Sequence, residues 1–128
     1  MPQDHEARAI WAVVEHFDLT ALYSQIDARG ETAGAPAIDP KILLAVWVYA
    51  TSEGQGSARE IWRLCEMHTA YRWLCGGVAI GYHTLSDFRS QQGHVFDSLI
   101  TQVLARLMKH DLVDLHRIAQ DGTRVRAS

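Results

Sequence analysis

The stretch Asp39-Pro-Lys-Ile-Leu-Leu-Ala-Val-Trp-Val-Tyr-Ala-Thr-Ser-Glu-Gly54 decides the fold of this chain of 128 residues. Asp39 can cap the free amides of a helix, and Pro40 suits a first helical turn. The residues from Ile42 to Ala50 are apolar nearly all round a helix, which is typical of a fully buried one. We therefore predict a central, most buried helix that begins here and ends near Gly54.

Shorter segments on both sides have the one-sided apolar spacing of amphipathic helices. A capping box at Ser57-Ala-Arg-Glu60 opens one of them, and a similar start at Thr84-Leu-Ser-Asp87 opens another that Gly93 ends. Glycines and a proline predict a linker over 29–37. The predicted helical segments are 5–17, 19–28, 57 to about 66, 69–74 (closed by Gly76-Gly77), 84–91 and 94–109.

These segments predict an all-α, multi-helix domain over 1–112, with a helix-turn-helix-like segment at about 57–91. The last stretch, 113–128, is predicted to hold a short strand or extended tail from about Leu115. Hydrophobic residues make up 48% and charged residues 21% of the chain, which is an ordinary globular composition and excludes a disordered protein.

The net charge of −3 gives the whole molecule no polyanion-binding signal. Residues 1–58 hold three basic residues against eight acids, whereas residues 59–128 hold nine basic residues against seven acids. Any nucleic-acid face is therefore expected in the second part. The two cysteines in apolar contexts, the absence of a long apolar run and an N-terminus unlike a signal peptide predict a reduced cytoplasmic protein without membrane contact.

The segment 57–91 carries the candidate DNA contacts. Arginine and glutamine can make bidentate contacts to base edges, while serine and threonine reach phosphates or bases. An alternative is that these residues are the solvated face of a helical bundle. The candidates are Arg59, Arg63, Arg72, His83, Thr84, Ser86, Arg89, Ser90 and Gln91.

Sulfur and imidazole donors suggest a zinc site as a second kind of chemistry. Cys65, His68, Cys75 and His83 have an unusual spacing for such a site, and buried structural cysteine is the commoner case. A free-standing enzyme that uses these residues is the function we favour least.

Several motifs in order resemble one group of bacterial insertion-sequence transposases, over about residues 38–128. The likeness lies in the helix quoted above and in five later motifs: Ser57-Ala-Arg-Glu-Ile, Cys65-Glu, Ala70-Tyr-Arg-Trp-Leu-Cys-Gly-Gly, His83-Thr-Leu-Ser-Asp-Phe-Arg and Ala119-Gln-Asp-Gly-Thr-Arg-Val-Arg-Ala-Ser.

This resemblance implies a helical domain that helps bind the terminal inverted repeats, followed by an RNase H-like core of the DDE type. In that core three acids hold two divalent metals, Mg²⁺ or Mn²⁺, for phosphodiester cleavage and strand transfer. Asp121 would be the first acid, although Asp-Gly after a strand is also a common hairpin signal. The other two acids would come later than residue 128, so we expect this chain alone to be inactive and to hold no cofactor.

The expected partner is double-stranded DNA, which implies a bacterial cytoplasmic protein that associates with the nucleoid when bound. The alternative function is a protein-interaction or dimerisation module without DNA specificity. In that case the apolar helices 41–50 and 94–109 would form a homodimer.

Overall fold

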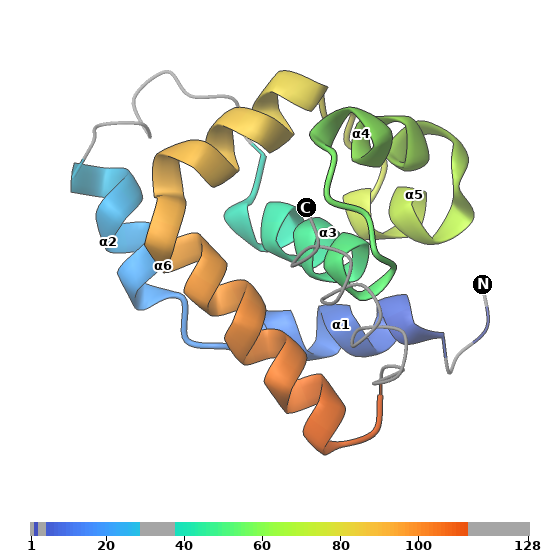
Figure 1. The fold of residues 1–128 in the computed structure, drawn as a ribbon, viewed down its shortest axis with the longest axis horizontal. Coiled ribbons are helices and arrows are strands. Elements are labelled where there is room, and N and C mark those ends of the chain that lie inside the picture. The colour runs from blue at the N-terminus through green and yellow to red at the C-terminus, as the bar shows by residue number, and fades with distance from the viewer. Residues whose placement is uncertain (1, 3–4, 29–37, 113–128) are drawn as a thin grey trace, which may run out of the picture.

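The computed structural model describes residues 2, 5–28 and 38–112, and these residues form six helices and no strand (Figure 1). The all-α prediction is confirmed for this part of the chain. The predicted linker 29–37 and the predicted strand or tail 113–128, with Asp121, lie outside the described residues. The helices are α1 (Glu6–Glu15), α2 (Thr20–Ala28), α3 (Pro40–Ser52), α4 (Ala58–Met67), α5 (Thr69–Cys75) and α6 (Tyr82–Lys109).

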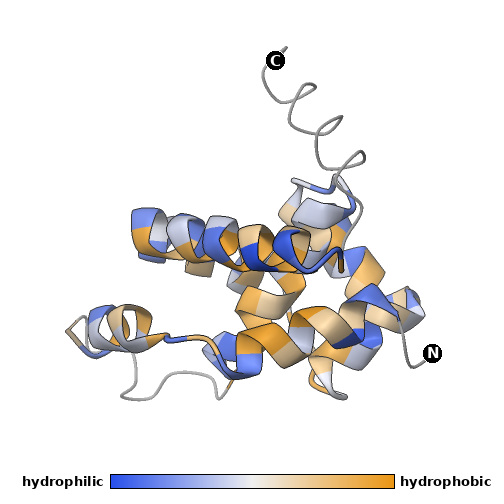
Figure 2. Ribbon diagram, turned by 90° about the horizontal axis from the view of Figure 1, so that it is seen from below, coloured by the Kyte–Doolittle hydropathy of each residue, from blue (hydrophilic) through white to orange (hydrophobic). Residues whose placement is uncertain are grey.

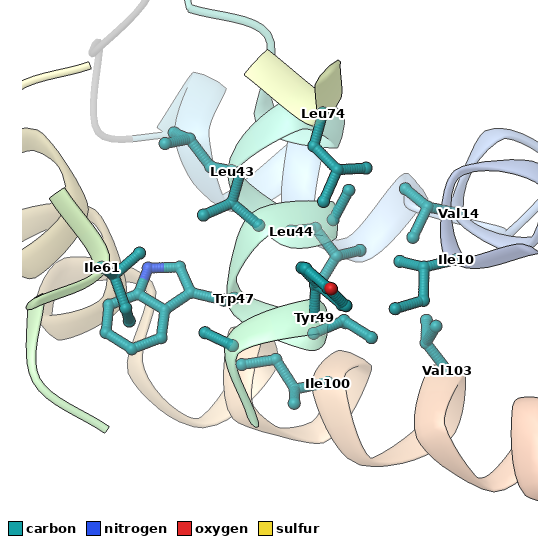
Figure 3. Packing of buried hydrophobic residues seen from close by; sticks show 14 of the residues in the cluster. Ile10, Val14, Leu43, Leu44, Trp47, Tyr49, Ile61, Leu74, Ile100 and Val103 are labelled. Carbon is teal, nitrogen blue, oxygen red and sulfur yellow. The ribbon is translucent and has the colours of Figure 1, made fainter. Parts of the chain in front are cut away.

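Helix α3 is the centre of the fold, as its sequence predicts. Every residue from Leu43 to Ala50 is buried. Figure 3 shows why: Ile10 and Val14 of α1 lie on one side of α3, and apolar side chains of α4, α5 and α6 lie around the rest. A helix that is apolar all round is stable in water only when it is enclosed in this way.

Side-chain caps fix where several helices begin. The Asp39 carboxylate accepts a hydrogen bond from the Lys41 amide at 2.9 Å, and the Ser57 hydroxyl accepts one from the Glu60 amide at 3.3 Å. Both predicted starts are therefore confirmed. At the C-terminal end of α5, Gly76 adopts the left-handed conformation (φ 60°), as its predicted role in closing this helix requires.

Helix α6 begins earlier than its sequence suggests. It starts at Tyr82, and the preceding Gly81 provides no side-chain cap. The Leu85 amide already donates to the Gly81 carbonyl at 3.2 Å, which places Thr84 within the first turn. The prediction that Thr84 opens this helix is therefore wrong.

A sharp elbow at Gly93 divides α6 into 82–92 and 94–109. Gly93 has φ 51° and ψ −122°, a conformation outside the helical region. The Gln25 side chain of α2 donates from Nε2 to the Gln92 backbone carbonyl at 2.9 Å and to the Gln92 side-chain oxygen at 2.8 Å. On the other side, the Arg89 guanidinium pairs with Asp97 at 3.0 Å across the break. The predicted helix end at Gly93 is thus confirmed as a break, which α2 and an ion pair hold in place.

Hydrophobic residues gather where the helices face one another, and hydrophilic residues lie towards the outside (Figure 2). Trp47 is buried and its indole donates to the Leu85 carbonyl at 3.2 Å. Trp73, by contrast, is 36% exposed. None of the six helices is long and apolar enough to span a bilayer.

Candidate nucleic-acid interface

Helices α4 and α5 and the first half of α6 carry the predicted DNA contacts. His68 alone joins α4 to α5, and its ring nitrogen caps α5 by accepting from the Ala70 amide at 3.3 Å. Helix α4 packs against both α5 and α6. A closely packed α5–α6 pair, which a helix-turn-helix would have, is not among the helix pairs in extensive contact in the described residues. The segment therefore contains the predicted series of short helices, and α4 is the helix that contacts the other two.

The first half of α6 places its apolar side chains inward and most of its polar side chains outward. Leu85 is buried, and Phe88 packs against the core. Thr84 and Arg89 are half-buried. The other candidates are exposed: Arg59, Arg63, Arg72, His83, Ser86, Ser90 and Gln91.

A cation and three rings meet where α4 approaches the start of α6. The Arg59 guanidinium lies 4.6 Å from the centre of the Tyr82 ring. That ring lies 4.1 Å from His83 and 6.3 Å from Trp62. Stacking restricts the rotamers of an arginine and fixes the plane of its guanidinium, so Arg59 is held beside the first turn of α6.

Tyr82 and Trp62 are site residues that sequence reasoning missed. Arg59 and Tyr82 are far apart in the sequence, and no helical spacing relates them. Only the packing of α4 on α6 brings them together.

The positive charge of this surface is modest. Residues 58–92 hold four arginines against three carboxylates. Arg63 pairs with Glu60 at 3.2 Å. Arg89 pairs with Asp97, and its guanidinium also lies 4.6 Å from the Trp47 ring. Arg89 thus has two partners within the fold, and a variant at this position would disturb the elbow as well as any DNA contact.

The four candidate zinc ligands do not converge. Cys65 and Cys75 both lie in the α4–α5 pair, but His68 caps α5 and His83 stacks on Tyr82. Across the described residues, no three His, Cys, Asp or Glu side chains gather as a metal site would need. The role predicted for Asp121 falls on a residue outside the described part.

The helices proposed for a dimer contact use their apolar faces within the domain. On α3, Leu43 to Ala50 are buried, and so is the apolar face of the second half of α6. These apolar faces are therefore occupied within the domain. A homodimer remains a prediction.

The fold defines the class of protein: an all-helical domain with exposed polar side chains on α4, α5 and the first half of α6. A family model described as Transposase domain (DUF772) matches residues 1–91. The match covers more than two thirds of the chain, and the chain belongs to this transposase domain family. Neither a curated protein nor a solved structure matches it.

Proposed function

We propose that this chain is the DNA-binding N-terminal part of an insertion-sequence transposase and that it recognises the terminal inverted repeats of its element. The observation that carries the proposal is the extent of the transposase-domain match. Residues 1–91 include every candidate contact from Arg59 to Gln91, and most of these side chains are exposed.

The first half of α6 would read the DNA. An α-helix fits the major groove of B-DNA, and side chains near its start reach base edges. Ser86, Ser90 and Gln91 are exposed on this segment. The first amides of α6 receive no side-chain cap from Gly81, so they are available to a phosphate oxygen.

Helices α4 and α5 would hold the DNA backbone. Arg59 beside the start of α6 and Arg63 one turn further along α4 are both exposed. Arg72 adds an exposed cation on α5. Three phosphate contacts would give a slope of about −3 in a plot of log affinity against log salt concentration.

The catalytic part of the proposal concerns a full-length transposase of the DDE type. There Asp121 would provide the first carboxylate of an RNase H-like core, and acids elsewhere in that protein would complete it. Bound Mg²⁺ or Mn²⁺ would activate water and a DNA 3′-hydroxyl for attack on phosphodiesters. The helical domain itself would bind DNA without metal.

Arg59→Ala is expected to weaken binding to a duplex of the element end about five- to tenfold and to reduce the salt slope by about 1. The loss follows because a cation held beside the first turn of α6 is removed. Fluorescence anisotropy at several salt concentrations, with the end duplex and a shuffled duplex of equal length, measures both quantities.

Arg106→Ala is the matched control. Arg106 is also an exposed arginine, stacked 5.1 Å from the centre of the Phe17 ring, but it lies on the second half of α6. Its loss should change affinity by no more than about twofold. Equal losses in the two variants, or no preference of the wild type for the end duplex, would rule out the proposed surface.

A further inference from the structure

The two cysteines of the chain lie together in the α4–α5 pair. Cys65 is 8% exposed and Cys75 is 3% exposed, and both are free thiols. They line the same hollow of about 520 Å³, and they lie on two helices that pack against each other and that His68 alone joins. Neither thiol has a role in the proposed DNA contact or in a metal site.

We propose that Cys65 and Cys75 are a modification site: a small hydroperoxide that enters this hollow oxidises the pair to an intramolecular disulfide joining α4 to α5. This inference does not depend on the proposed DNA binding.

The hollow gives a small oxidant access to both sulfur atoms. It opens to solvent between α5 and the segment 77–80, and Thr69, Arg72 and Val78 are among the exposed residues that line it. The low exposure of both thiols excludes a bulky reagent and a cysteine of a second chain. Hydrogen peroxide is small enough to enter.

The two thiols are chemically different. Interaction with the Cys65 side chain lowers the pKa of Cys75, and burial only partly opposes this effect. Interaction with the Cys75 side chain, together with burial, raises the pKa of Cys65. Cys75 is therefore the group that forms the thiolate, and Cys65 retains its proton.

The reaction follows from this difference. The Cys75 thiolate attacks one oxygen of the peroxide, the O–O bond breaks, and hydroxide leaves, which gives a sulfenic acid on Cys75. The Cys65 sulfur then attacks the Cys75 sulfur, an S–S bond forms, and water leaves with the Cys65 proton. Two thiols lose two electrons in total, and one peroxide gains them.

The fold favours the disulfide over further oxidation. The resolving thiol lines the same hollow as the attacking one, so the second step takes place between two sulfurs that are already neighbours there. Helices α4 and α5 pack against each other, and His68 alone connects them. These contacts keep the two cysteines close to each other until Cys65 attacks the sulfenic acid on Cys75.

The test treats the reduced full chain with hydrogen peroxide, unfolds it in urea, blocks the remaining thiols with iodoacetamide and maps the peptides by mass spectrometry. Both alkylation sites should disappear together, with a Cys65–Cys75 linked peptide that dithiothreitol reverses. Independent loss of the two sites, disulfide-linked dimers as the main product, or sulfinic acid on either cysteine without a linked peptide would overturn the proposal.

Single variants test the order of the steps. When each variant is treated with hydrogen peroxide and then unfolded in urea that contains the sulfenic-acid reagent dimedone, Cys65→Ser should be labelled at Cys75 at least about tenfold more than Cys75→Ser is labelled at Cys65. Equal labelling would overturn the assigned roles. Circular dichroism checks that each variant is folded. If a serine variant is not folded, the alanine variant at the same position, Cys65→Ala or Cys75→Ala, replaces it. The linked peptide in the wild-type chain tests the site independently of every variant.

Discussion

Leu44→Ala is expected to lower the free energy of unfolding by about 2–5 kcal/mol. Leu44 is completely buried in the middle of α3, and it lies among apolar side chains of neighbouring helices (Figure 3). Because α1, α5 and α6 pack around α3, the side chains around residue 44 have little freedom to move into the cavity that the smaller alanine leaves. Urea denaturation followed by helical circular dichroism measures the change.

Met67→Ala is the comparison for this variant. Met67 is 74% exposed at the end of α4, so its truncation should change the free energy of unfolding by less than about 0.5 kcal/mol. The contrast between the two variants tests whether α3 is the centre of the fold. A Leu44→Ala chain as stable as the Met67→Ala chain would contradict that assignment.

Gly93→Ala is expected to lower the free energy of unfolding by about 1–3 kcal/mol, although there is room for the added methyl group. A Cβ at Gly93 would have no neighbouring atom within 4 Å, so the cost does not come from crowding. It comes from φ 51° and ψ −122°, which a residue with a Cβ rarely adopts. A chain that relieves the strain by straightening α6 would lose the bonds from Gln25 to Gln92.

Gly56→Ala separates this effect from the general cost of removing a glycine. Gly56 also has no atom within 4 Å of an added Cβ, but its backbone is not in the left-handed region. Its replacement should leave the free energy of unfolding within about 1 kcal/mol of the wild type, and a small increase is the expected direction. If urea denaturation gives the two variants the same midpoint, the elbow is not a strained feature of the fold.

Local signals in the sequence were enough to predict most of the helices. The apolar run from Ile42 to Ala50 requires enclosure, and the side chains of Asp39 and Ser57 cap the helices that they precede. Gly76 ends α5 because it can adopt a positive φ. Each of these effects depends on a few neighbouring residues, and a sequence shows such effects directly.

The parts that could not be predicted depend on tertiary contacts. The start of α6 at Tyr82 has no side-chain cap. The sequence therefore marks this helix start only through Thr84, which lies two residues after the observed start. Arg89 belongs to the predicted outer face, yet Asp97 and Trp47 engage its guanidinium once α6 bends and packs on α3. The contact of Arg59 with Tyr82 likewise exists only because α4 packs on α6.

The candidate site was therefore predicted as a set of residues but not as a geometry. Exposure of Ser86, Ser90 and Gln91 follows from helical periodicity alone. The availability of each arginine to DNA does not, because a carboxylate from another segment can neutralise its charge, as Asp97 does for Arg89. This difference makes Arg59 a sharper test position than Arg89.

The most direct test of the DNA-contacting surface is a titration of the ¹⁵N-labelled chain with a duplex of the element end, followed through backbone amide chemical shifts. The largest changes should fall at the start of α4 and over 82–92. Amides of 94–107, beyond the elbow, should change little. Changes centred on α1, α2 or the second half of α6 would contradict the claim that α4 and the first half of α6 form the DNA-contacting surface.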